Sequence, residues 1–240
     1  MNMKSKLEFL KEKIEEMRRT KMPDSEKMIG EVAKKHLISQ WAGSPAEALL
    51  NTVLAVRQKW KETVEPRLDD FRKNYPNVRT IYDLKAIVDS MNERDFCLNV
   101  FGMRITETPN KRYQMLNNMI AVFVKYQKEK GFNSDYEAMK DWAQRCDLPN
   151  LESDPIGKLP NVGLATVQNL RICLGVNTLK PDVHIKNALK EIGLGNDVAL
   201  CDLVSELTGY SPLELDQIFW HWDKSRSEKN EITEEEFEKL

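Results

Sequence analysis

The chain has little glycine and no long run of apolar residues. Glycine supplies only 10 of its 240 residues, beside ten methionines. Scarce glycine and abundant Lys and Glu favour helices. No apolar stretch approaches the ~18 residues that a membrane helix needs, so no membrane contact is expected. The first 19 residues lack the apolar core of a signal peptide, which predicts a cytoplasmic protein.

Cysteine pairs of the C-x-x-C type are also missing. The four cysteines lie far apart in the sequence, at Cys97, Cys146, Cys173 and Cys201. This spacing excludes a zinc ribbon or a compact iron–sulfur loop built on neighbouring ligands, and no metal site is expected. Four scattered thiols in a chain of this length are typical of a reduced compartment.

The composition is that of a globular protein with little net charge. Hydrophobic residues make up 41% and charged residues 31%, and the formal net charge is −2. The length fits one large domain or two small ones. The window 158–190 has five basic residues against one acid, a net charge of +4. That window fits either a nucleic-acid surface or an ordinary solvated helix face.

Helix signals recur along the chain, and no hairpin turn joins two alternating segments, so an all-α fold is predicted. Ser44-Pro45 and Ser211-Pro212 are typical helix starts, and Ser134 and Thr233 begin capping boxes. Helices are expected at 4–20, 24–40, 45–58, 60–74, 79–90, 92–101, 111–130, 134–146, 154–158, 164–174, 182–192, 196–208, 211–223 and 233–240.

The expected helix at 45–58 is apolar on nearly every side over PAEALLNTVLAVR. It should therefore be a central, buried helix. Asn51 and Thr52 interrupt the apolar surface and leave one flank that can meet a cleft.

The segment 156–166, IGKLPNVGLAT, has the most informative pattern. It lies between the short helix expected at 154–158 and the apolar helix that follows. Pro160 should end the short helix, because proline lacks an N–H. Asn161 and Gly163 tolerate a positive φ, so the pattern predicts a tight turn.

Such a turn delivers the backbone N–H groups of Val162 to Ala165 to the start of the next helix. Unpaired N–H groups and the helix dipole together form a site for an anion such as phosphate. Thr166 can add a hydroxyl contact. The same pattern also fits an ordinary corner between two helices.

Asp182 follows Pro181 and lies 19 residues after Gly163. A helix-forming segment comes next, so the carboxylate is expected at a helix N-terminus. Aspartate is a common N-cap residue, so helix capping alone would explain its presence there.

Taken together, two segments resemble the helix–hairpin–helix DNA glycosylase superfamily. They are LPNVGLATVQNLRICLG at 159–175 and KPDVHIKNALKEIG at 180–193. The family has an L-P-G-V-G hairpin and then a V-D-x-H-[VI] segment with the catalytic aspartate. Asp182 and His184 fall on that Asp and that His.

Two further segments resemble the family more weakly. Residues 48–58, ALLNTVLAVRQ, are similar to an early helix that ends in a glutamine probing the duplex, which here is Gln58. Residues 215–220, LDQIFW, resemble the last core helix. The resemblance runs from about Ser44 to Trp222.

The chain departs from the family pattern at three points. Asn161 replaces the usual hairpin glycine, and Ala165 stands where the bifunctional branch has its nucleophilic lysine. Cys201 is the only cysteine among the last forty residues, so the optional four-cysteine cluster is absent. Alanine cannot form a Schiff base, and Lys180 is the nearest alternative amine to Asp182 in sequence.

The resemblance implies two helical lobes with a DNA-binding cleft between them. One lobe is a multi-helix barrel over 43–173 that includes the helix–hairpin–helix at about 154–174. The other combines 1–42 with 174–240 and presents Asp182 to the cleft.

The function implied is a monofunctional DNA N-glycosylase that flips and excises a damaged or mismatched base in base excision repair. Asp182 would be catalytic, and His184 and Trp220 would line a base pocket. No cofactor is required, although a monovalent cation can bind the hairpin backbone when DNA is bound. The expected partner is double-stranded DNA, and the protein is expected to be a monomer, at the nucleoid in a prokaryote. DNA contacts would come from Gln58, Leu159, Pro160, Asn161, Val162, Gly163, Leu164, Ala165 and Thr166.

Several alternatives stay open at this point. A glycosylase-like fold can bind DNA as a damage sensor without chemistry, and the modest net charge is compatible with that. A helical protein-interaction module is a second alternative, but it leaves the hairpin and Asp182 unexplained. Each tryptophan that can stack on a flipped base can equally pack in a core; these are Trp41, Trp60, Trp142, Trp220 and Trp222.

Overall fold

The computed structural model describes residues 3–22, 25–35, 44–105, 108–195 and 200–230. All regular secondary structure within these ranges is helical, apart from one isolated antiparallel bridge between Lys21 and Met28. The predicted all-α class is therefore confirmed.

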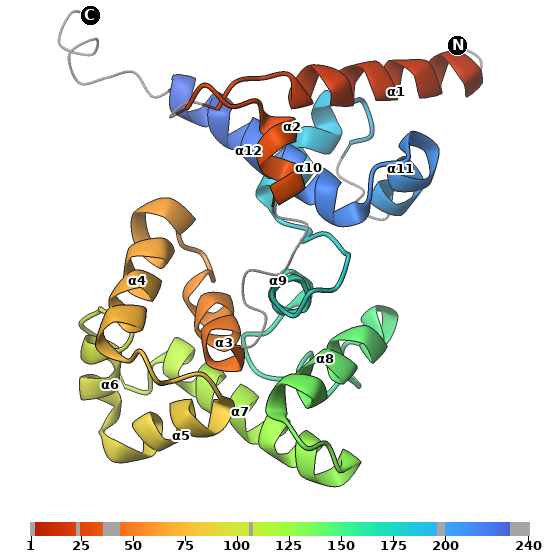
Figure 1. The fold of residues 1–240 in the computed structure, drawn as a ribbon. Helices are drawn as coiled ribbons and strands as arrows, with labels where there is room; N and C mark the ends of the chain where they lie inside the picture. Colours follow the sequence, from red (N-terminus) through yellow and green to blue (C-terminus); the bar gives the residue numbers. More distant parts are fainter. Residues whose placement is uncertain (1–2, 23–24, 36–43, 106–107, 196–199, 231–240) are drawn as a thin grey trace, which may run out of the picture. The chain divides into compact units, whose positions relative to one another are not determined.

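The chain divides into two compact units (Figure 1). The central unit is Ser39–Val176, and the terminal unit combines Met1–Ile38 with Asn177–Leu240. The lobes expected from the sequence were 43–173 and 1–42 with 174–240. Their assignment to a glycosylase architecture stays a prediction.

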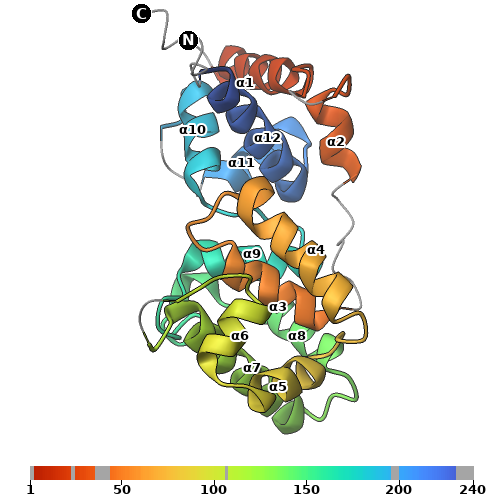
Figure 2. The ribbon, with the colours of Figure 1, turned by 90° about the vertical axis from the view of Figure 1, so that its left-hand side faces the viewer.

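The central unit is a set of helices around one helix, α3. Its elements are α3 (Pro45–Leu54), a π-helical turn η1 (Trp60–Val64), α4 (Glu65–Asn74), α5 (Ile81–Ser90), α6 (Glu93–Asn99), α7 (Lys111–Lys130), α8 (Asp135–Arg145), a 3₁₀ turn η2 (Leu148–Asn150) and α9 (Leu164–Cys173). Helix α3 contacts α4, α5, α7, α8 and α9, and both views show it in the middle of the unit (Figures 1 and 2).

The prediction of a central buried helix is confirmed, since all ten residues of α3 are buried. The open flank expected at Asn51 and Thr52 is wrong, because both side chains are buried and hydrogen-bonded inside the unit. Asn51 accepts a hydrogen bond from Trp60 Nε1 at 3.0 Å, and Thr52 Oγ1 donates to Ala48 O at 2.8 Å.

The terminal unit packs around α12. Its helices are α1 (Met3–Arg18), α2 (Ile29–Lys35), α10 (Val183–Glu191), α11 (Leu200–Thr208) and α12 (Pro212–Asn230). Helix α12 contacts the other four. A second core, separate from that of the central unit, contains Ile14, Ile185, Leu189 and Phe219.

Several expected helix bounds are wrong. Within the described residues, the helix expected at 24–40 covers only Ile29–Lys35, because Met22 N–H bonds to Lys27 O in a turn. The helix expected at 211–223 continues to Asn230. The helix expected at 233–240, and residues 196–199 of the one expected at 196–208, lie outside the described residues.

The short helix expected at 154–158 is also wrong, since this segment is a series of turns. The buried Asp154 carboxylate accepts the N–H groups of Ile156 and Gly157, both at 2.8 Å. A side chain that takes local amides competes with helix formation. The first helix of the expected helix–hairpin–helix is thereby replaced by a turn anchored on Asp154.

Candidate functional site

The predicted tight turn is present between Leu159 and Gly163. Val162 N–H donates to Leu159 O at 3.1 Å, and Asn161 has a φ of 66°. Asparagine is one of the few residues that accept this left-handed conformation, so the turn forms without a glycine at this position. Gly163 does not take a positive φ as its residue type allowed, since its φ is −127°.

The turn leads directly into an uncapped helix N-terminus. Gly163 is the N-cap of α9 and offers no side-chain acceptor. Its carbonyl already accepts the N–H groups of Thr166 and Val167. Among the described residues, the N–H groups of Gly163, Leu164 and Ala165 have no acceptor. Three amides are therefore available where the sequence predicted four, because Val162 N–H donates inside the turn.

These three amides can reach a ligand. Gly163 is exposed, Leu164 is 42% exposed, and a Cβ placed on Gly163 would meet no atom within 4 Å. Unpaired amides at the positive end of a helix attract an anion. This end of α9 can therefore hold a phosphate or a carboxylate.

The other side chains of the hairpin divide into two groups. Leu159 and Val162 pack against the core of the central unit, so they anchor the turn. Pro160 and Asn161 are exposed and border a hollow of about 390 Å³. The sequence pattern gave no indication of this hollow. Its other lining residues are Glu93, Pro109, Tyr113, Gln114, Asn117 and Asn118.

The base of the hairpin is fixed by buried contacts. Asp154 accepts Trp142 Nε1–H at 3.0 Å in addition to its two backbone amides. Gly157 has no space for a side chain, since a Cβ there would lie 2.4 Å from Leu151 O. The turn is therefore held rigidly on the core while its tip stays open.

Gln58 is exposed, but it does not end a helix as the resemblance implied. Helix α3 ends at Leu54, and Gln58 lies beyond it in a loop that contains Arg57 with a φ of 54°. The loop is held by Arg112, whose Nη2 donates to Val56 O at 2.7 Å. A positive φ three residues past the helix could not be read from the sequence.

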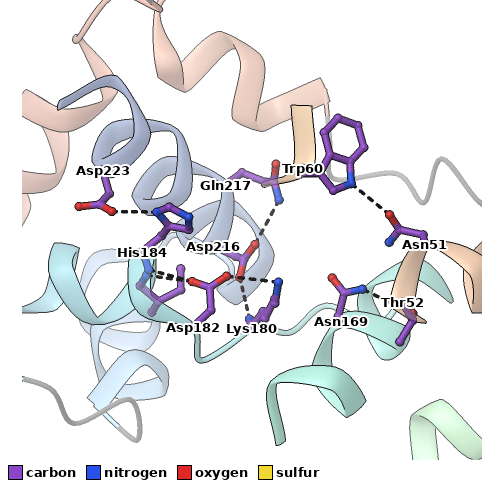
Figure 3. A network of polar contacts seen from close by, with 11 residues as sticks. Asn51, Thr52, Trp60, Asn169, Lys180, Asp182, His184, Asp216, Gln217 and Asp223 are labelled. Atoms are coloured by element: carbon purple, nitrogen blue, oxygen red, sulfur yellow. Dashed lines mark hydrogen bonds and ion pairs between the residues drawn. The ribbon is translucent and has the colours of Figure 1, made fainter. Parts of the chain in front are cut away.

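Asp182 is the N-cap of α10, as predicted. Its Oδ1 accepts the N–H groups of His184 and Ile185 at 3.0 and 3.3 Å. Its Oδ2 lies 3.3 Å from Lys180 Nζ, and the carboxylate side chain is 17% exposed (Figure 3). One oxygen therefore caps the helix, while the other forms an ion pair with Lys180.

A second carboxylate, Asp216, lies beneath this loop and was not singled out from the sequence. Asp216 is buried on α12, and its Oδ1 accepts Lys180 N–H at 2.7 Å (Figure 3). Gln217 Nε2 donates to its Oδ2 at 3.1 Å. Burial, reinforced by the charge of Asp182, raises the pKa of Asp216 to about 7, against the lowering effect of Lys180.

The two predicted pocket residues are in contact. The rings of His184 and Trp220 meet edge to face with centroids 5.9 Å apart. His184 Nδ1 lies 2.8 Å from Oδ2 of buried Asp223, which also accepts Asn187 Nδ2–H at 3.2 Å (Figure 3). A carboxylate fixes the orientation of the imidazole. That they line a base pocket stays a prediction.

The remaining tryptophans have structural partners. Trp142 is buried and donates to Asp154, and Trp60 donates to Asn51. Trp222 is buried under the guanidinium of Arg226, 4.7 Å from its ring centroid. Trp41 lies outside the described residues.

Comparisons with protein-family models, curated proteins and solved structures gave no match to this chain. No helix among the described residues has the length and apolar character needed to cross a bilayer.

Proposed function

We propose that the protein is a monofunctional DNA N-glycosylase that flips and excises a damaged or mismatched base from duplex DNA. The observation that supports this best is the hairpin: a left-handed Asn161 leads into three unpaired amides at the start of α9. A DNA backbone phosphate is a fitting ligand for such a site, and phosphate contacts fix the register of a protein on the duplex.

Asp182 is the proposed catalytic residue. A stacked base shields its N-glycosidic bond, so the nucleotide must be flipped out at a cost of a few kcal/mol. As the bond between C1′ and the base breaks, the sugar becomes oxocarbenium-like. The carboxylate of Asp182 stabilises that positive charge and orients water.

The bonds formed and broken define the product. The electron pair of the C1′–N bond leaves with the base, which takes up a proton. Water loses one proton as its oxygen bonds to C1′. Ala165 cannot attack C1′, so the product is an intact abasic site.

The other predicted site residues have supporting roles in this proposal. Gln58 is exposed on its loop and would enter the space left by the flipped nucleotide. His184 and Trp220 would contact the flipped base, with the ring of His184 oriented by Asp223. The proposal requires Asp182 and the hairpin to engage the same duplex.

The proposed hairpin cation is compatible with the turn. Within the described chain, the carbonyl oxygens of Pro160, Asn161 and Val162 accept no backbone hydrogen bond. Backbone carbonyls are the ligands that hard monovalent cations prefer. A bound cation would supply positive charge beside the DNA phosphate, and the chemistry at C1′ would not involve it.

A glycosylase-like protein that binds DNA without excising a base is the second candidate. The ion pair between Asp182 Oδ2 and Lys180 Nζ favours it, because a paired carboxylate has less charge to offer a transition state. The two candidates share the hairpin and differ only in the chemistry at Asp182.

A panel of labelled duplexes separates them. Duplexes with alkylated, deaminated or oxidised bases are incubated with the protein, and base release is scored with and without later alkali. The glycosylase releases at least one base and leaves a strand that breaks only after alkali. Binding to the same duplexes without release of any base would support the sensor instead.

A further inference from the structure

Two arginines of the central unit have buried donors without partners. Arg67 lies on α4, and Arg112 lies in the first turn of α7. Nη1 of Arg67 and Nε of Arg112 are buried and make no hydrogen bond. Leaving a buried donor unpaired is unfavourable, and more so when the group is charged.

The two guanidinium groups also repel each other. Burial and the nearby charge of Arg67 both lower the pKa of Arg112. The first turn of α7 contains no acidic residue, and its positive helix end adds to the same field. Glu93 reaches this end of α7, but it accepts the backbone N–H of Asn110.

Neighbouring groups nevertheless hold both arginines in place. Arg112 Nη2 donates to Val56 O at 2.7 Å. The stem of Arg67 lies against Gly102, where an added Cβ would be 3.5 Å from Arg67 Cγ. Gly102 has a φ of 61°, a conformation that side-chain-bearing residues rarely adopt. Contacts with neighbouring groups thus fix both side chains within the central unit.

We propose that Arg67 and Arg112 form a second phosphate site, which takes a backbone phosphodiester of the bound DNA. Planar guanidinium groups present donors that match phosphate oxygens, and a negative charge between them removes the repulsion. Arg112 holds the carbonyl of Val56, two residues before Gln58. The site therefore lies beside the loop proposed to enter the duplex, and it rests on the proposed function.

The test measures how duplex affinity depends on salt. Each phosphate contact contributes about −0.9 to the slope of log affinity against log salt. Arg67→Gln should make the slope shallower by about one contact. Arg145→Gln is the matched control, since Arg145 is exposed and already paired with Asp141 at 2.7 Å, and its slope should be unchanged. Equal slopes for Arg67→Gln and the wild type would overturn the proposal.

Thermal unfolding in inorganic phosphate, at matched ionic strength with chloride, gives a reading that needs no DNA. Phosphate should raise the melting temperature of the wild type and of Arg145→Gln more than that of Arg67→Gln. Equal increases in all three proteins would overturn the anion site. A further outcome separates the two proposals. If Arg67→Gln loses the phosphate effect but the wild type binds no duplex, the arginines bind an anion that is not DNA. That result would overturn both the assignment of this site to DNA and the proposed function.

Discussion

Replacing Asp216 by asparagine should change how stability depends on pH. The wild-type carboxyl is buried under Lys180, accepts its N–H at 2.7 Å and has a pKa of about 7 instead of 3.8. Asparagine keeps an oxygen for that N–H and does not titrate. The variant therefore removes the charge while preserving the hydrogen bond.

The sign and the size follow from proton linkage. Between pH 4 and pH 7 the folded protein holds a proton on Asp216 that the unfolded chain has lost, so stability falls as pH rises. The difference between 3.8 and about 7 amounts to about 4 kcal/mol, at 1.36 kcal/mol per pH unit. The wild type should lose this amount relative to Asp216→Asn between about pH 4 and pH 8.

Urea unfolding at half-unit steps from pH 3.5 to pH 8.5 measures this difference. Asp202→Asn, which removes an exposed acid of α11, is the control and should follow the wild type. Asp182→Asn should move the transition of Asp216 to lower pH, since the charge of Asp182 raises that pKa. Parallel curves for the wild type and Asp216→Asn would refute the reasoning.

Three further predictions concern the hairpin and the missing lysine. Gly163→Val should lower the melting temperature only slightly, because its Cβ meets open space although valine is a poorer N-cap than glycine. It should weaken duplex binding and make the salt slope shallower by about one contact; unchanged affinity would show that this end of α9 does not touch DNA. Gly157→Ala should instead lower the free energy of unfolding by about 1–3 kcal/mol, because its Cβ would overlap Leu151 O. Urea unfolding measures this loss, and a variant as stable as the wild type would contradict the described turn. Borohydride should trap no protein–DNA adduct, since Ala165 has no amine. Efficient trapping would contradict the monofunctional assignment, and its loss in Lys180→Ala would identify Lys180 as the nucleophile.

Local sequence signals predicted much of the fold. Ser134 and Ser211 cap their helices as expected, through hydrogen bonds to the N–H groups of Glu137 and Glu214. Asp182 caps α10, and Asn161 takes the left-handed conformation. These features depend on residues within about four positions of one another, so the sequence contains them directly.

Features that depend on distant contacts were missed. The expected helix at 154–158 yields to a turn because the Asp154 carboxylate takes its amides while bonded to Trp142. Helix α3 stops before Gln58, in a loop tied by a side chain from α7. Asp216 lies 36 residues from the Lys180 N–H that it accepts. None of these contacts leaves a periodic or local pattern.

Single-turnover base release by Asp182→Asn tests the central proposal most directly. Asparagine retains the Oδ1 acceptor for the N–H groups of His184 and Ile185 and is an equally good N-cap, so the fold should persist. The substitution removes the negative charge and, with it, the ion pair to Lys180. With the best duplex from the panel, the release rate should fall by about 10²–10³ or more while duplex affinity stays nearly unchanged. A folded Asp182→Asn protein that releases the base at the wild-type rate would contradict catalysis by Asp182 and leave this residue only its helix cap.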